Sequence, residues 1–386
     1  MKAIIWIIFS FLNFTYARAE SIRFAWSGDL GGQNVCRDEK LGYPIFKQIE
    51  NVKPDFFIGL GDMIYADGLC KPIGRYGNKQ IPGNFTKSFD KKNFKAHWRY
   101  NFTEKNFKSL LNKTEYYTLW DDHEIVNDFG PKDQTRKHPK TNKPTKLMDI
   151  GWEAYKAFNQ DVANKGQSKS YFKLSKGEHL ELFFLDNRKF RDHNEKEDDI
   201  KNPKTMLGQE QLSWFKQAVV ESSATWKIIV SSVPISIPTG RANRRDGWAN
   251  YKDKTGFELE LKSILDYFKQ KQVKNMIWIT TDVHFATGFE YDLGDDYKFH
   301  EFVVGPLSAH FYPNKNMDST FNPKRLYFYA PEKEPTSFNE AVKWFNFGFI
   351  EIDELGKLSV NIINGEGKSV FKKTLPAIKN KKFSKK

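Results

Sequence analysis

The sequence predicts an α/β protein in which two β-sheets pack on each other and helices cover their outer faces, within one domain. Three observations support this prediction. Strand-like and helix-like segments alternate along most of the 386 residues, antiparallel β patterns follow at the C-terminal end, and no internal repeat or Pro/Ser-rich linker divides the chain. Hydrophobic residues make up 39% and aromatic residues 16% of the chain, which suffices for a large core and argues against disorder.

The first half of the chain opens with a predicted β-α-β unit. Residues 21–26 alternate in hydrophobicity and end before a glycine, residues 43–52 have helical spacing, and residues 55–61 read as a buried strand. Residues 70–100 are rich in glycine, proline and lysine, so we expect a long loop or insert there. The next predicted elements are a short helix (106–113), a strand (116–120) and an amphipathic helix (151–163).

The second half continues the alternation and then becomes purely β. Residues 171–188 predict two antiparallel strands. The elements that follow are a helix (209–222), a strand (226–235), a helix (258–271) and a strand (275–284). Residues 299–309 and 347–375 predict C-terminal β structure, the latter with turns at "LGK" and "GEGK".

The N-terminus has the features of an export signal. Lys2 precedes an apolar run over residues 3–14, and Ala17-Arg18-Ala19 fits the small-x-small cleavage pattern. We therefore expect a signal peptide over residues 1–19 and a secreted or periplasmic protein with one domain over 20–376 and a basic tail over 377–386. The apolar run is too short to span a bilayer comfortably, and no later segment is apolar enough to do so.

The cysteine count and the net charge narrow the functional classes. In an oxidising compartment Cys36 and Cys70 either form one disulfide or remain two free thiols, and the absence of a CxxC motif argues against a structural zinc site. The net charge of +13 favours anionic partners such as phosphorylated substrates. The sequence lacks a specific nucleic-acid recognition motif, and much of the positive surplus lies in the C-terminal tail.

Four predicted strands end in acidic or histidine-containing motifs, namely "WSGDLGGQ" (26–33), "GLGDMIYADG" (59–68), "LWDDHEIVND" (119–128) and "TTDVHFATG" (280–288). Functional groups of open α/β folds collect in the loops past the carboxyl ends of strands. An aspartate after a strand is, by itself, equally typical of a helix N-cap. Four such motifs together predict a metal site, and the side chains that they offer are Asp29, Asp62, Tyr65, Asp122, His123, Asp282 and His284.

The densest motif, "DDHE" at 121–124, carries charge that repels itself unless a cation or hydrogen bonds hold it. Oxygen ligands mixed with imidazole suit Fe, Mn, Zn or Mg. A pair of such ions lowers the pKa of bound water to near neutrality, and two ions about 3.5–4 Å apart clamp the attacking and leaving oxygens of a phosphoryl centre. Charge of this density is therefore tolerated if a dication or trication neutralises it.

The order of the motifs resembles the PhoD-like alkaline phosphatases of the calcineurin-like metallophosphoesterase superfamily. Eight segments over residues 21–365 carry the resemblance: "FAWSGD…GQ", "PDFFIGLGDMIYADG", "WDDHE(x)VN", "LDNRKFR", "MLGQEQLSWF…ATWKIIVSSVPI", "DGWANY", "TTDVHFATG" and "FVVGPLSA". The resemblance implies a four-layer α/β/β/α sandwich with a dinuclear metal centre, in which Fe³⁺ and Ca²⁺ are expected by analogy and Mn²⁺ or Zn²⁺ are alternatives.

The resemblance also implies roles for individual residues. The implied ligands are Asp62 between both ions, Asp29, Tyr65 and His284 on a ferric ion, Asp122 and Asp282 on the second ion, and Asn127 as a further candidate. His123 matches the superfamily histidine that protonates the leaving oxygen. This chain departs from the superfamily pattern in having Asp122 where an asparagine usually precedes that histidine, and Asp29 where some members have cysteine.

Two arginines in "LDNRKFR", Arg188 and Arg191, leave two alternatives open. A planar guanidinium binds phosphate oxygens in bidentate fashion, which suits capture of the substrate phosphate. The other alternative is an ion pair with Asp186 or Asp192 that closes the loop. The polar loop "TGRANRRDGW" (239–248) is expected to carry exposed charge, and the six histidines outside the motifs are expected to be surface or structural residues.

The sequence thus predicts an exported metal-dependent phosphoesterase, an alkaline phosphatase or phosphodiesterase that acts on small-molecule or polymeric phosphate esters. His123 and Arg188 are the predicted catalytic residues. Two alternatives use the same residues: a hydrolase of another bond, and a non-catalytic metal- or phosphate-binding protein on a metallophosphatase scaffold.

Overall fold

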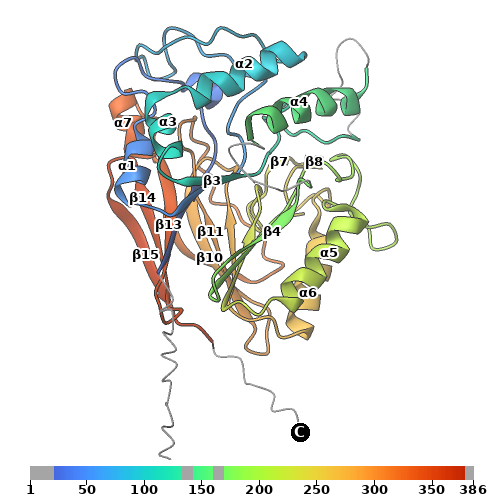
Figure 1. Ribbon diagram of the computed structural model, residues 1–386. Coiled ribbons are helices and arrows are strands. Elements are labelled where there is room, and N and C mark those ends of the chain that lie inside the picture. Colours follow the sequence, from blue (N-terminus) through green and yellow to red (C-terminus); the bar gives the residue numbers. More distant parts are fainter. Residues whose placement is uncertain (1–20, 133–141, 160–168, 379–386) are drawn as a thin grey trace, which may run out of the picture.

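The computed structural model describes residues 21–132, 142–159 and 169–378, so the predicted signal peptide, most of the basic tail and the end of the predicted helix 151–163 lie outside the described residues. The described part forms two large sheets that pack face to face, with helices on both outer sides (Figure 1). None of the described helices combines the length and the apolar composition that crossing a membrane requires.

The first sheet has six strands in the order β15-β14-β13-β1-β2-β3. β1, β2 and β3 are parallel to one another, while β13 pairs antiparallel with β1 and begins an antiparallel run to β15. The bounds are β1 (Ile22–Ser27), β2 (Phe56–Gly59), β3 (Glu115–Thr118), β13 (Asn346–Ile352), β14 (Leu358–Asn364) and β15 (Ser369–Leu375).

The second sheet has seven strands in the order β12-β10-β11-β9-β6-β5-β4. Its centre, from β5 to β11, is parallel, and its edges are antiparallel. The bounds are β4 (Phe172–Lys176), β5 (Leu180–Phe184), β6 (Trp226–Val230), β9 (Met276–Thr280), β10 (Ala286–Asp292), β11 (Lys298–Val303) and β12 (Pro323–Tyr329). A separate two-stranded ribbon, β7 (Gly240–Arg241) and β8 (Arg244–Arg245), follows β6.

The helices divide between the outer faces of the two sheets (Figure 1). Helices α5 and α6 cover the second sheet, and the others lie on the side of the first sheet or above the sandwich. Their bounds are α1 (Ile45–Asn51), α2 (Lys91–Phe102), α3 (Lys105–Leu111), α4 (Pro144–Asn159), α5 (Gly208–Glu221), α6 (Glu258–Gln270) and α7 (Phe338–Val342), with a 3₁₀ turn η1 (Gly32–Asn34) after β1.

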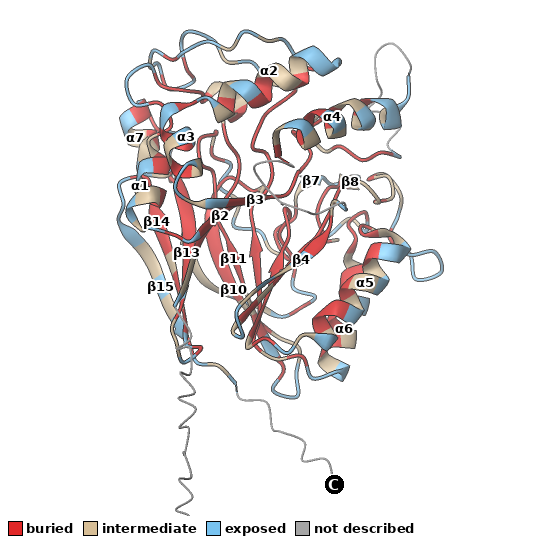
Figure 2. Ribbon diagram, viewed as in Figure 1, coloured by how far each residue is buried: buried red, intermediate tan, exposed pale blue. Residues whose placement is uncertain are grey.

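Alternation along the strands produces three hydrophobic layers. In β2, Phe56 and Ile58 pack between the sheets, whereas Phe57 packs outward against α1, where its ring lies 6.1 Å from that of Phe46. The second sheet repeats this pattern, with Trp278 of β9 facing α5 and α6. The central strands β2, β6 and β9 are therefore buried along their whole length, whereas the edge strand β15 is mostly exposed or half-buried (Figure 2). The predicted four-layer α/β/β/α sandwich is confirmed.

Several elements differ from the sequence prediction. The expected loop 70–100 contains the start of α2, which Asp90 caps by accepting a hydrogen bond from the backbone N–H of Asn93. The lysine-rich composition there hides the helical spacing of Phe94 and Trp98, which are buried. Helix α4 begins at Pro144 instead of residue 151, and β10 and β12 were not predicted.

Candidate metal centre

The four strand-end motifs meet at one end of the sandwich. Three of them follow β1, β2 and β3 of the first sheet, and the fourth follows β9 of the second sheet. Because these strands are parallel within their sheets, their carboxyl ends lie at the same edge. Potential ligand atoms come within 4.8 Å of one another in overlapping groups: Asp29, Asp62 and His284; Asp62, Asp122 and His123; Asp121, Asp122 and Asp282; and Asp122, Asp128 and Asp246.

The backbone of this centre adopts an uncommon conformation at four of the predicted ligands. The φ angles are 62° at Asp29, 53° at Asp62, 77° at Asp282 and 60° at His284, all in the left-handed region. Residues other than glycine adopt this region rarely, and such residues cluster at functional sites. The loops after β1 and β2 also approach each other closely here. A Cβ atom on Gly28 would lie 2.8 Å from the carbonyl oxygen of Gly61.

Asp29, Tyr65 and His284 form the first group of potential ligands. His284 Nε2 lies 2.9 Å from the Tyr65 hydroxyl and 3.8 Å from Asp29 Oδ1. His284 Nδ1 contacts the backbone carbonyl oxygen of His310, which directs Nε2 to the centre. Burial lowers the pKa of His284 to about 3, so its imidazole is neutral, as a metal ligand must be.

Asp29 has a buried carboxylate oxygen that suits a metal ligand. Its Oδ2 accepts a hydrogen bond of 2.8 Å from the Thr281 hydroxyl, but its buried Oδ1 has no hydrogen-bond donor among the described residues. Burial raises the pKa of Asp29 to about 8 and that of the Tyr65 phenol well above its usual value. A buried carboxylate oxygen without a donor is costly, and a metal ion is the partner that these side chains fit.

Asp62, Asp122 and Asp282 form the second group. Asp62 belongs both to the group with Asp29 and His284 and to the group with Asp122 and His123. Its Oδ1 accepts a hydrogen bond of 3.1 Å from the backbone N–H of His123. Burial raises the pKa of all three carboxyls, and neighbouring carboxylates raise those of Asp62 and Asp282 further. Asn127 lines the same cavity.

His123 pairs with a carboxylate that the sequence reasoning missed. Its Nδ1 lies 2.7 Å from Asp67 Oδ1. Burial alone lowers the pKa of His123, but Asp67 and Asp122 outweigh burial and raise it to about 10, so the ring is cationic near neutral pH in this arrangement. Asp67 stands in the same "GDMIYADG" motif as Asp62, and this proximity was the available signal.

Glu124 stabilises the backbone of two loops of the centre. Its carboxylate accepts hydrogen bonds from the backbone N–H groups of Asp62 (3.0 Å), Met63 (2.7 Å) and Asp121 (2.6 Å). These bonds tie the loop after β2 to the loop after β3. The dense "DDHE" motif therefore combines residues that face the centre with residues that hold its backbone.

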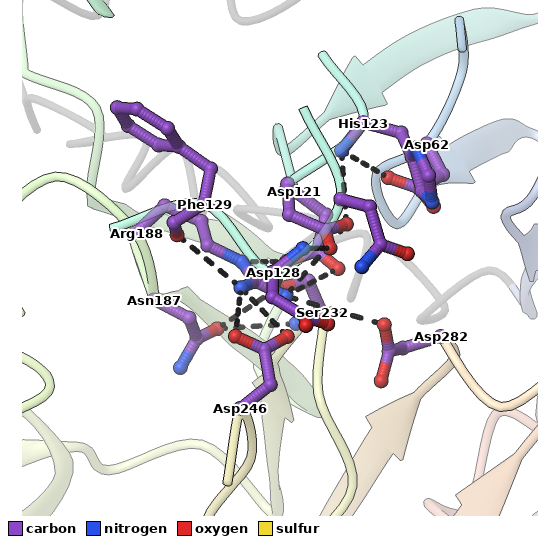
Figure 3. A network of polar contacts seen from close by, with 12 residues as sticks. Asp62, Asp121, His123, Asp128, Phe129, Asn187, Arg188, Ser232, Asp246 and Asp282 are labelled. Atoms are coloured by element: carbon purple, nitrogen blue, oxygen red, sulfur yellow. Dashed lines mark hydrogen bonds and ion pairs between the residues drawn. The ribbon is translucent and has the colours of Figure 1, made fainter. Parts of the chain in front are cut away.

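Arg188 lies behind the carboxylates and is completely buried. Its guanidinium binds Asp121 through two bonds of 2.6 and 3.0 Å and Asp246 through two bonds of 2.7 and 2.8 Å (Figure 3). It also lies 3.9 Å from Asp122 and 4.0 Å from Asp282. Most N–H groups of the guanidinium therefore donate to protein carboxylates.

The ion pairs of the two arginines differ from the pairing with Asp186 or Asp192 that the sequence offered as one alternative, whereas capture of a substrate phosphate stays a prediction. Asp186 accepts a hydrogen bond from the backbone N–H of Arg188 and does not pair with its guanidinium. Arg191 pairs with Asp246 at 3.0 Å. Asp246, expected as an exposed loop charge, is buried, and Arg188 and Arg191 outweigh the effect of burial and lower its pKa to about 2.

Cys36 and Cys70 form a disulfide, which joins the loop after β1 to the loop after β2. This is one of the two alternatives that the sequence left open. Both loops also carry predicted ligands, Asp29 and Asp62, so the bond limits their relative movement.

A cavity of about 230 Å³ opens over the centre. Among the described residues that line it there is no lysine or arginine. The lining residues are Gln33, Asp62, Asp122, His123, Asn127, Asp128, Ile237, Pro238, Thr239, Gly240, Asp246, Asp282, Val283, His284, Phe285, Tyr312 and Asn314.

The sandwich and the strand-end centre define a protein class, the α/β proteins of the metallophosphoesterase type. The family model described as PhoD-like phosphatase matches residues 24–359, and the chain belongs to this family. The resemblance seen in the motifs is thereby confirmed.

Individual relatives are more distant. Alkaline phosphatase D of Bacillus subtilis (strain 168) is 22% identical over 273 residues, which is 64% of this chain and 44% of that protein. This chain thus spans less than half the length of that relative. The structure titled "Structure of PhoD" matches 95% of this chain and 73% of its own, at 16% identity and a TM-score of 0.66. A purple acid phosphatase, PPD1 from yellow lupin (Lupinus luteus) seeds, matches 92% of this chain and 54% of its own, at 12% identity and a TM-score of 0.57.

Proposed function

We propose that the protein is a metal-dependent phosphoesterase that hydrolyses phosphate mono- or diesters. The observation that carries this proposal is the buried group of carboxylates at the strand ends, in which one oxygen of Asp29 has no donor among the described residues and a cationic His123 lines the same cavity. Membership of the PhoD-like phosphatase family supports the proposal.

The proposed metal ligands follow the two groups of side chains. Asp29, Tyr65 and His284 would hold one ion, Asp122, Asp282 and Asn127 would hold the other, and Asp62 would serve as a ligand in both sets. A phenol with a raised pKa ionises readily only beside a strong cation, which favours Fe³⁺ at the Tyr65 position. Ca²⁺ is the second ion by family resemblance, and Mn²⁺ or Zn²⁺ fit the same donor types.

When bound, such ions supply a nucleophile derived from water near neutral pH and offset the charge that develops on phosphorus oxygens. His123 contributes the proton that the leaving alkoxide needs. Asp67 binds Nδ1 of His123, which fixes the ring and leaves Nε2 as the nitrogen that serves the substrate. Arg188 keeps Asp121 and Asp246 neutralised behind the ligands, and in this geometry it acts as a positioning residue for the centre.

The proposal is tested with two variants and two substrates. Asp62→Asn should abolish metal binding and hydrolysis together. His123→Ala should lower kcat for an alkyl phosphate by about 10²–10⁴-fold, since the alkoxide leaves poorly without a proton. It should lower kcat for a nitrophenyl phosphate much less, because nitrophenolate leaves without protonation. Elemental analysis of the purified protein measures the metal content.

His193→Ala provides the matched control, because His193 is partly exposed and does not line the cavity. It should leave both kcat values unchanged. Hydrolysis that survives Asp62→Asn would refute the proposed centre. Equal losses for both substrates in His123→Ala would refute the proton donation. Metal binding without hydrolysis of any ester would favour the non-catalytic alternative.

We also propose that the protein is exported. Support comes from the "MKAIIWIIFSFLNFTYARAE" terminus and from the Cys36–Cys70 disulfide, which suits an oxidising compartment. N-terminal sequencing of the protein recovered outside the cytoplasm should begin at Glu20. A mature protein that retains Met1 would contradict the proposal.

A further inference from the structure

Tyr312 is a large aromatic side chain that stays 51% exposed although it lines the cavity over the centre. Its ring centroid lies 5.2 Å from that of His284, a proposed metal ligand, and 4.7 Å from that of His310. Its hydroxyl makes no hydrogen bond with the described residues. The ring is thus one side chain away from the metal centre and open to whatever enters the cavity.

The segment that carries Tyr312 is held at both ends against loops of the site. Near its start, the backbone N–H of Ser308 donates to the carbonyl oxygen of Asp29 at 3.0 Å. Near its end, the backbone N–H of Asp318 donates to the carbonyl oxygen of Ser236 at 2.8 Å. These bonds anchor the backbone on both sides of Tyr312, which holds the segment that carries the ring beside the site.

The cavity is polar and charged at its floor and has an exposed aromatic ring at its wall. The floor is formed by the carboxylates and imidazoles of the centre, whereas the exposed ring of Tyr312 supplies apolar surface at the wall; the side chains of Ile237 and Phe285, which also line the cavity, are only 1% exposed. A pocket of this kind suits a ligand with an anionic head and a flat apolar group. Aromatic groups gain from stacking on an aromatic ring as well as from burial.

We propose that the exposed ring of Tyr312 forms a subsite for an aromatic group carried by the phosphate ester. The inference rests on the proposed function, since the phosphoryl group must lie at the metal centre for its substituent to reach this wall. The subsite gives the enzyme a preference for esters with a flat aromatic substituent over esters with a small alkyl substituent.

The test measures binding of two phosphonates, which the enzyme cannot hydrolyse at their carbon–phosphorus bond. Isothermal titration of the metal-loaded protein compares phenylphosphonate with methylphosphonate. The wild-type protein should bind phenylphosphonate more tightly. Tyr312→Ala should reduce this advantage by roughly 3–10-fold, the range expected from loss of one aromatic contact. Tyr312→Phe should retain it.

Tyr267→Ala is the matched control, because Tyr267 lies partly buried on α6 and does not line the cavity. It should keep the phenyl advantage of the wild type. If Tyr312→Ala weakens both phosphonates equally, Tyr312 only shields His284 and the subsite is refuted, while the phosphoesterase proposal stands. If the wild-type protein binds neither phosphonate, the subsite and the proposed function are both refuted.

Discussion

Replacing Arg188 by methionine should destabilise the protein strongly, because the change removes the charge that two buried carboxylates share. The guanidinium makes two bonds to Asp121 and two to Asp246, and all three side chains are at most 2% exposed. Removing one partner of a buried ion pair lowers the free energy of unfolding by about 3–5 kcal/mol, because the other charge stays buried without its partner. Asp246 keeps its bond to Arg191, and Asp121 keeps a bond of 2.6 Å from Ser232, so the lower end, about 3 kcal/mol, is expected.

Urea unfolding of the chelator-treated protein, followed by circular dichroism, measures this loss. Arg75→Met is the matched control, since Arg75 pairs with Glu334 at 2.9 Å but the two side chains are 36% and 53% exposed. The control should cost less than about 1 kcal/mol. Equal losses in the two variants would show that the buried network contributes no more than a surface pair, and the reasoning would fail.

Two further predictions concern carboxyls whose pKa is raised. Chelation should lower the free energy of unfolding, and the loss should grow from pH 5 to pH 8. In the metal-free fold the pKa of Asp29 is about 8 against 3.8 normally, so stability is lost as pH rises through this window unless a cation replaces the proton. A pH-independent chelator effect in urea titrations would contradict this. Separately, burial raises the pKa of Glu301 from 4.5 to about 7, and Glu301→Gln should gain up to about 3 kcal/mol relative to the wild type between pH 4.5 and pH 8. A constant difference across that range would contradict the assignment.

The grouping of these side chains was largely predictable because the proposed ligands follow strand ends. Asp29 and Asp62 each follow a short hydrophobic strand that the sequence identifies, and parallel pairing of β1 with β2 places both at one edge. Asp282 likewise follows a strand end, but β9 belongs to the second sheet, so its convergence with Asp29 and Asp62 depends on how the two sheets pack.

The ion pairs that Asp246 and Asp67 form were not predictable from strand ends. Asp246 stands in a loop of polar residues, and its burial depends on Arg188, which lies 58 positions earlier in the chain. Asp67 was visible in a quoted motif, but only the fold brings it to His123, 56 positions away. Pairings at this separation leave no periodic pattern, so the sequence predicts exposed charge for one and no role for the other.

The distribution of positive charge explains how one chain carries both a surplus of +13 and an acidic site. Arg188 and Arg191 lie behind the ligand carboxylates, and the described lining of the cavity includes no lysine or arginine. Two like charges 4 Å apart repel by about 4 kcal/mol near a protein surface, so those of the carboxyls that are ionised repel an anionic ester unless cations lie between them. We therefore expect affinity for the phosphoryl group to depend on the proposed metals and on the cationic His123, and discrimination among esters to depend on the wall of the cavity at Tyr312.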